Sequence, residues 1–153
     1  MNVLIVDDHP VVLEYVTSAV KKALPEAVIR TAGDLTTALA LAGEVPMNLV
    51  VLDLGLPGCG GLDSIVRFRK AFPDVRVLVV SSNDDEQSIF GALGVGAAGF
   101  VPKTAGPKML LQALRVVVRG ERFIPQEFLA GQAGKRPGAG ERQEAVGGRK
   151  AKS

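Results

Sequence analysis

The stretch Leu49-Val50-Val51-Leu52-Asp53 sets the fold of this chain, because four aliphatic residues in succession end in one carboxylate. A strand that is apolar on both faces is typical of the centre of a parallel sheet, since helices cover both sides of such a sheet. We therefore predict a central strand over residues 48–53. Three other short apolar runs also lead into a polar group. They are 3–6 before Asp7-Asp8, 77–80 before Ser81, and 99–101 before Pro102-Lys103.

Segments with helical periodicity separate these apolar runs along the chain. We expect strands over 2–6, 27–31, 48–53, 76–80 and 99–101. We expect helices over 10–24, after a cap at Asp34, from Leu62, after Asp84 or Asp85, and over 107–119. Strands that alternate with helices form βαβ units and a parallel sheet. The sequence thus predicts one doubly wound α/β domain of (βα)5 type, with a five-stranded parallel sheet, over residues 1–124.

Composition places the chain among soluble globular proteins. Its 153 residues, 47% of them hydrophobic, suffice for one domain with a substantial core. No apolar run approaches the ~20 residues that cross a bilayer, and the N-terminus lacks the pattern of a signal peptide. One cysteine, Cys59, cannot form an internal disulfide and fits a reducing compartment. We expect a cytoplasmic protein with no membrane association.

Charge is distributed unevenly along the chain. The formal net charge is +2, yet residues 1–124 are close to neutral and 125–153 carry six basic and three acidic residues. A near-neutral folded part argues against a nucleic-acid-binding core, which needs a basic face. The last stretch is rich in glycine and nearly free of large apolar residues, so it cannot bury enough surface to offset the entropy of ordering. We expect a mostly disordered C-terminal tail over 125–153.

The polar residues that follow the strands should meet at one edge of the sheet. Open α/β sheets bind their ligands at the carboxyl ends of the strands. Asp8 and Asp53 would offer oxygen ligands to Mg²⁺, which prefers octahedral oxygen coordination, and Asp7 would orient a metal-bound water. Crowded carboxylates repel one another unless a cation compensates them. The alternative for Asp7 or Asp8 is a simple cap on the first helix.

Asp53, Ser81 and Lys103 together suggest phosphoryl transfer. A carboxylate can act as a nucleophile and form an acyl phosphate, so Asp53 is the natural acceptor. Lys103 would neutralise charge on the transferred group, and Ser81 would donate a hydrogen bond to it. Taken singly, Lys103 could be an ordinary surface lysine and Ser81 a strand-end residue.

Four motifs in this order resemble those of response-regulator receiver domains: VLIVDDHP, LVVLDLGLPG, VLVVSSNDDE and GAAGFVPK. The resemblance covers about residues 2–124, and the ending GFVPKTAGPKMLLQALRVVVRGERFI is most similar to the NarL/FixJ (LuxR-type) subfamily. It implies a flavodoxin-like fold and phosphorylation of Asp53 by a sensor histidine kinase. It also implies Mg²⁺ held by Asp8, Asp53 and the backbone carbonyl of Gly55, with Asp7 nearby.

The resemblance further implies that Ser81 and Phe100 are switch residues and that Lys103 is the charge partner of the phosphoryl group. From the residues alone, Phe100 is as well explained as a core aromatic. His9 has no partner in the sequence and is interpreted as a helix-start residue rather than a phosphate carrier or metal ligand. Cys59 is assigned no role.

Members of this subfamily usually continue into a helix-turn-helix domain. Only 29 residues follow Ile124, too few for that domain, so we expect no DNA-binding domain within this chain. On the last helix, Leu111 and Val118 are expected to lie off the core face. We predict a phosphorylation-dependent homodimer through the fourth helix, the fifth strand and the fifth helix.

The function predicted from these features is a signalling switch and not an enzyme. It would catalyse its own phosphorylation and dephosphorylation and turn over no metabolite. One alternative is a non-phosphorylated interaction module, which the complete set of site residues disfavours. Another is a Mg²⁺-dependent phosphatase with an aspartyl nucleophile, which would need a substrate pocket and a general acid. A nucleotide-binding module would need a glycine-rich phosphate loop after the first strand, where the chain instead has acids.

Overall fold

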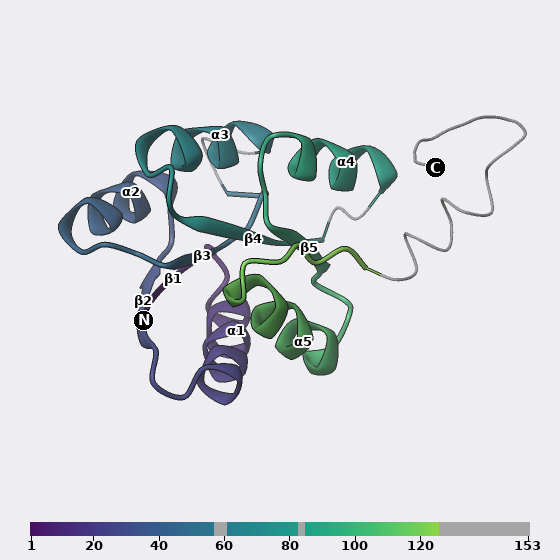
Figure 1. Cartoon of the computed structure of the whole chain (residues 1–153), viewed down its shortest axis with the longest axis horizontal. Helices are drawn as coiled ribbons and strands as arrows, with labels where there is room; N and C mark the ends of the chain where they lie inside the picture. Colours follow the sequence, from purple (N-terminus) through teal and green to yellow (C-terminus); the bar gives the residue numbers. More distant parts are fainter. Residues whose placement is uncertain (57–60, 83–84, 126–153) are drawn as a thin grey trace, which may run out of the picture. The chain divides into compact units, whose positions relative to one another are not determined.

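The computed structural model of the chain describes residues 1–56, 61–82 and 85–125 (Figure 1). It contains five strands and five helices in strict alternation within the compact unit Met1–Phe123. The elements are β1 (Asn2–Val6), α1 (Pro10–Ala23), β2 (Val28–Ala32), α2 (Leu35–Glu44), β3 (Leu49–Leu52), α3 (Leu62–Ala71), β4 (Arg76–Ser81), α4 (Glu86–Gly94), β5 (Gly99–Pro102) and α5 (Pro107–Val118). Cys59, the helix start expected at Asp84 and the tail over 126–153 lie outside the described residues.

All strands are parallel, in the order β2-β1-β3-β4-β5. This order reverses direction between β1 and β3, as in the flavodoxin-like doubly wound fold. Helices α1 and α5 cover one face of the sheet, and α2, α3 and α4 cover the other (Figure 1). The predicted (βα)5 fold is therefore confirmed.

The central strand β3 is buried along its whole length. Its neighbours β1 and β4 are also aliphatic and almost wholly buried, because each lies between two layers of helices. The register pairs Val6 with Leu52 and Leu52 with Val79, and it pairs Ser81 with Pro102. β1 and β3 thus end level with each other, β4 and β5 extend two residues further, and the residues that follow all four strands share one edge.

Side-chain caps begin two of the helices. Asp34 accepts a hydrogen bond from the backbone N–H of Thr37 (2.7 Å) at the start of α2. Asp85 accepts one from the backbone N–H of Ser88 (2.7 Å) at the start of α4. Each bond satisfies one of the N–H groups that the first helical turn leaves without an intrahelical partner. The cap at Asp34 is confirmed, and Asp85 is the cap of α4.

The chain after α5 returns to the sheet beside β5. The backbone N–H of Phe123 donates to the carbonyl of Ala98 (2.9 Å), and the N–H of Phe100 donates to the carbonyl of Phe123 (3.2 Å). Gly99 makes this approach possible, because a Cβ there would lie 2.9 Å from the carbonyl oxygen of Phe123. The buried Phe123 thereby closes the core that α1 and α5 form against the sheet.

Some expected details differ in the structure. β2 is shifted by one residue, and β4 and β5 each extend one residue further than predicted, because the ladder between them continues to Ser81 and Pro102. On α5, Leu111 and Val118 were expected to lie off the core face. Both are half-buried and pack against the core. Within the described residues, no helix is long and apolar enough to span a bilayer.

Candidate functional site

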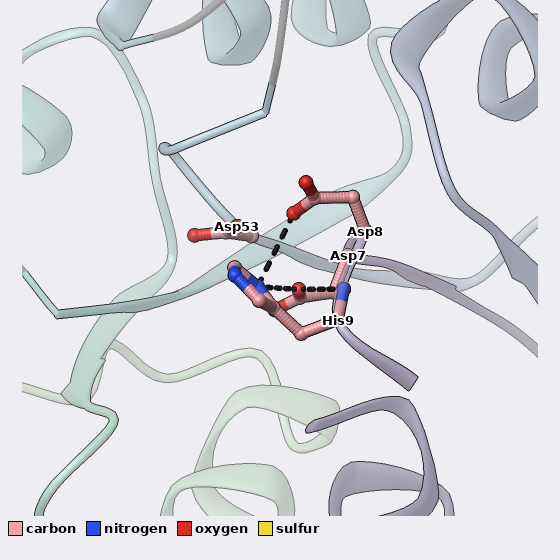
Figure 2. Close-up of side chains that lie close together, drawn as sticks. All are labelled: Asp7, Asp8, His9 and Asp53. Atoms are coloured by element: carbon pink, nitrogen blue, oxygen red, sulfur yellow. Dashed lines mark hydrogen bonds and ion pairs between the residues drawn. The ribbon is translucent and has the colours of Figure 1, made fainter. Parts of the chain in front are cut away.

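Three carboxylates and a lysine meet at the carboxyl edge of the sheet. Asp7 and Asp8 follow β1, Asp53 follows β3, and Lys103 follows β5. One side-chain oxygen from each of the three aspartates, together with a ring nitrogen of His9, lies within 4.8 Å of the others (Figure 2). The structure therefore brings together the acidic residues that the sequence places at the strand ends.

Lys103 pairs with two buried carboxylates at once. Its Nζ lies 3.1 Å from Oδ2 of Asp7 and 3.3 Å from Oδ1 of Asp53. Both aspartates are almost fully buried, and the lysine side chain is 16% exposed. The backbone N–H of Lys103 donates to the carbonyl of Ser81 (2.9 Å), which ties the base of the lysine to the end of β4. Because buried charge is costly unless it is paired, Lys103 is an internal partner and not an ordinary surface lysine.

The two oxygens of Asp53 have different surroundings. Oδ1 accepts a hydrogen bond from the backbone N–H of Gly55 (3.0 Å) and pairs with Lys103. Oδ2 is buried, and no described residue donates a hydrogen bond to it. Buried acceptors are nearly always satisfied, so Oδ2 is a buried site atom with unused capacity to bind a cation or attack an electrophile.

The donor set fits a hard divalent cation. Three carboxylates against one lysine leave the site net negative, and their oxygens are the ligands that Mg²⁺ prefers. Asp8 is more exposed than Asp7 and Asp53; its side chain therefore borders solvent, from which a cation would bring its remaining waters. Gly55 lies against Asp53 through its N–H, and the role of its carbonyl as a ligand stays a prediction.

His9 was not expected to belong to this site. Its Nδ1 lies 2.8 Å from Oδ1 of Asp7 and 3.2 Å from Oδ1 of Asp8, and its backbone N–H donates to the same Asp7 oxygen (2.9 Å) (Figure 2). His9 is the N-cap of α1 but makes no side-chain cap bond. The helix-start position is confirmed, and the alternative that Asp7 or Asp8 is that cap is wrong. The sequence signal that could have indicated these contacts was the position of His9 directly after two acidic residues.

Ser81 lies near the site, whereas Phe100 lies in the core. Ser81, the last residue of β4, is 2% exposed, and Phe100 on β5 is fully buried. Gly55 and Ser81 line a cavity of about 450 Å³ whose far wall is the start of α4. The cavity thus offers room for a group beside Gly55, whose N–H donates to Asp53, and beside Ser81. The burial of Phe100 agrees with its interpretation from the sequence as a core aromatic.

A family model described as the response regulator receiver domain matches residues 3–115. The nitrate/nitrite response regulator protein NarP of Escherichia coli K12 is 29% identical over 125 residues, which are 82% of this chain and 58% of NarP.

Solved receiver domains have the same fold. The isolated receiver (REC) domain of RcsB from Salmonella enterica serovar Typhimurium, solved with the phosphomimetic BeF3⁻, has a TM-score of 0.79 at 25% identity. The match covers 85% of this chain and 96% of that one. A LuxR-family two-component response regulator from Aurantimonas sp. SI85-9A1 has a TM-score of 0.79 at 28% identity, with coverage of 87% and 95%. The chain spans about 60% of the length of the curated relatives that it matches.

Proposed function

This chain belongs to the response regulator receiver family of two-component systems, and we propose that it is a phosphoacceptor switch in which Asp53 receives a phosphoryl group from a sensor histidine kinase. Regulators of this family pair with such kinases and generally bind Mg²⁺ at an acidic pocket. The observation that carries the proposal is the buried Oδ2 of Asp53, which has no hydrogen-bond partner among the described residues. A phosphoacceptor needs one carboxylate oxygen held in place and the other one open.

The phosphoryl transfer follows from this division of the two oxygens. Oδ2 of Asp53 attacks phosphorus while the bond from phosphorus to the donor histidine nitrogen breaks, so that the histidine leaves as a neutral imidazole after taking a proton. Mg²⁺, when bound by Asp8, Asp53 and the carbonyl of Gly55, supplies positive charge to the transferred oxygens. Lys103 adds a fixed positive charge, and Ser81 donates a hydrogen bond, both at the positions where charge develops.

The remaining expectations are part of the same proposal. Asp7 holds Lys103 and orients a metal-bound water. Ser81 and Phe100 carry the change away from the site. The chain catalyses only its own phosphorylation and dephosphorylation, acts in the cytoplasm where kinase domains phosphorylate their regulators, and self-associates through α4, β5 and α5 on phosphorylation.

Intact-mass measurement with acetyl phosphate and Mg²⁺ tests the proposal. Wild-type protein and the control Asp74→Asn, which removes an exposed aspartate at the opposite edge, should each gain one phosphoryl group. Asp53→Asn, and wild type with the metal removed, should gain none. An adduct of equal yield on Asp53→Asn would overturn the assignment of the phosphoacceptor.

A wild-type protein without an adduct is tested further with beryllofluoride, because rapid hydrolysis hides a short-lived acyl phosphate. Beryllofluoride mimics the phosphoryl group and does not hydrolyse, and the RcsB receiver domain was solved in its presence. Failure of wild type to bind it with Mg²⁺ would favour the non-phosphorylated interaction module. Steady turnover of a small phosphomonoester would instead favour the phosphatase.

A further inference from the structure

Three arginines line one cavity at the amino edge of the sheet, opposite Asp53. Arg69 comes from the last turn of α3, Arg76 begins β4, and Arg122 follows α5. The cavity has a volume of about 340 Å³, and its remaining wall is formed by Leu93 in the last turn of α4 and by residues 96–98 before β5. Residues that are far apart in the sequence thus concentrate three positive charges at one place in the fold.

None of these three guanidinium groups pairs with a carboxylate in the part of the chain that the structure describes. Their hydrogen bonds go to backbone carbonyls. Arg69 donates to Pro73 (3.3 Å) and Val75 (3.4 Å), Arg76 to Glu121 (3.3 Å), and Arg122 to Leu93 (2.7 Å) and Ala97 (3.3 Å). The side chain of Glu121 pairs instead with Arg119. The cavity therefore holds positive charge that no acidic side chain of the described residues neutralises.

Most of the hydrogen-bonding capacity of these arginines is unused. A guanidinium carries five N–H donors, whereas the bonds above employ only Nη1 of Arg69, Nη2 of Arg76 and Nη2 of Arg122. The Nε of Arg76 is buried and has no acceptor among the described residues. A buried donor without an acceptor is unfavourable, so an acceptor supplied by a ligand would lower the free energy of this cavity.

Helix capping explains only part of the cluster. Cations favour the C-terminal ends of helices, and Arg122 contacts Leu93 in the last turn of α4 in that manner. Arg76 lies on a strand and is not explained in this way. Gly96 also has a φ of +107°, and a Cβ there would lie 2.8 Å from Nε of Arg69. The absence of a side chain at Gly96 leaves the space that the guanidinium of Arg69 occupies beside the cavity.

We propose that this cavity is a binding site for an oxyanion, either a phosphate group or a carboxylate, held by Arg69, Arg76 and Arg122. Guanidinium groups match both oxyanions through paired N–H donors. The site lies at the other end of the strands from Asp53, so it does not depend on the proposed phosphoacceptor function. Its ligand is a small phosphorylated or carboxylated compound.

The test is an NMR titration of the whole chain with inorganic phosphate, and separately with succinate, in metal-free Tris chloride at constant ionic strength. The backbone amides of Gly96 and Ala97 and the Nε–H of Arg76 report on the cavity. For wild type, these signals should shift along a single-site curve. Arg76→Gln should weaken that binding by about tenfold or more, the equivalent of one charge-assisted hydrogen bond.

Arg115→Gln is the matched control, since it removes the same charge from an exposed position on α5 outside the cavity. It should bind as wild type does. If Arg76→Gln does not fold, Arg122→Gln serves in its place. Shifts with phosphate alone would identify a phosphorylated ligand, and shifts with both probes would extend the site to carboxylates. The absence of saturable shifts with either probe, or equal weakening in Arg115→Gln, would overturn the proposal.

Discussion

Lys103 is the residue on which the acidic edge depends. It lies between two buried carboxylates and contacts both (3.1 and 3.3 Å). Asp7 and Asp53 would otherwise be two like charges in a region from which water is largely excluded, where repulsion is strong. The lysine therefore has a structural role whenever no cation is bound, in addition to the role proposed for it in phosphoryl transfer.

Replacement of Lys103 by Gln should destabilise the metal-free protein by about 3 kcal/mol, because breaking a buried ion pair leaves its partner uncompensated. Mg²⁺ should restore part of this loss by supplying the missing positive charge. Urea unfolding with and without Mg²⁺ measures both effects. Lys108→Gln, at an exposed position of α5, is the control and should unfold as wild type does. A Lys103→Gln protein as stable as this control would show that the ion pairs contribute little.

Removal of His9 should change the affinity of the site for Mg²⁺. The imidazole lies 2.8 Å from an oxygen of Asp7 and 3.2 Å from one of Asp8, so these oxygens are shared between the ring and any incoming cation. His9→Ala should bind Mg²⁺ up to about tenfold more tightly, as expected when a competing hydrogen bond to a charged group is lost. Isothermal titration calorimetry measures the affinity.

The only histidine of the chain also reports directly on this competition. Its ring signals in the NMR spectrum should move as Mg²⁺ binds in wild type, since the ring must give up its contacts with the two acids. A weaker affinity in His9→Ala would instead mean that the ring nitrogen helps to hold the metal.

At the scale of elements, periodicity predicted the strands and helices well because the sheet is covered on both faces. A strand buried on both faces, such as β3, is recognised by a short run of aliphatic residues, and this pattern can be seen within the segment itself. The ends of the strands were less predictable. Ser81 and Pro102 extend their strands because they pair with each other, and this pairing is not visible in either segment alone. The contacts of His9 and the arginine cavity were missed for a similar reason. They depend on which turn or strand lies beside which, and no spacing along the chain encodes this.

Two glycines in α4 should respond differently to replacement by alanine. A Cβ at Gly94 would have no atom within 4 Å, whereas one at Gly91 would lie 2.7 Å from Cδ1 of Leu62 on α3. Gly94→Ala should stabilise the protein by about 0.5 kcal/mol, because alanine restricts the unfolded chain more than glycine does. Gly91→Ala should lose this gain to the contact with Leu62. Thermal unfolding compares them, and equal stabilisation of both would show that Leu62 moves aside freely.

The cap of α2 predicts a specific loss of stability in acid. Hydrogen bonds from the backbone N–H and then the hydroxyl of Thr37 hold the pKa of Asp34 below its ordinary value of 3.8. A carboxyl whose pKa is lowered by folding stabilises the native state above its unfolded pKa. That contribution is lost as the pH falls below 3.8 and through the lower folded-state pKa.

Asp34→Asn isolates this effect, because asparagine caps a helix equally well and does not titrate. Wild type should lose stability relative to Asp34→Asn only at pH values below 3.8, while other carboxyls affect both proteins alike. Urea unfolding at several pH values measures the difference. A difference that is independent of pH would show that the cap is equally strong when Asp34 is protonated.

At the scale of the whole molecule, the sheet has two chemically different edges. The carboxyl edge carries Asp7, Asp8 and Asp53 around one lysine, and the amino edge carries three arginines that form no ion pair with a carboxylate among the described residues. The near-neutral charge of residues 1–124 therefore conceals a separation of charge along the strands. Substitutions at one edge should leave ligand binding at the other largely unchanged, which makes the two proposed sites separable by experiment.

The stability of the folded unit should depend on the residues up to Phe123 and not on those that follow it. The compact unit ends at Phe123, whose side chain is 9% exposed and whose backbone bonds to Ala98 and Phe100. A fragment of residues 1–124 should therefore unfold at the same urea concentration as the whole chain. A fragment of residues 1–120 should be less stable by about 3 kcal/mol, since it loses one buried aromatic side chain and two backbone hydrogen bonds. It also loses Arg122, which donates to Leu93 and Ala97.

Comparison of the two fragments distinguishes the contribution of residues 121–124 from that of 125–153. If 1–124 unfolds as early as 1–120, stability depends on the last 29 residues, and the proposed disordered tail is wrong. If both fragments unfold with the whole chain, the contacts of Phe123 contribute little and the folded unit ends at α5. Only a loss confined to the shorter fragment supports a receiver domain that includes Phe123 and is independent of the tail.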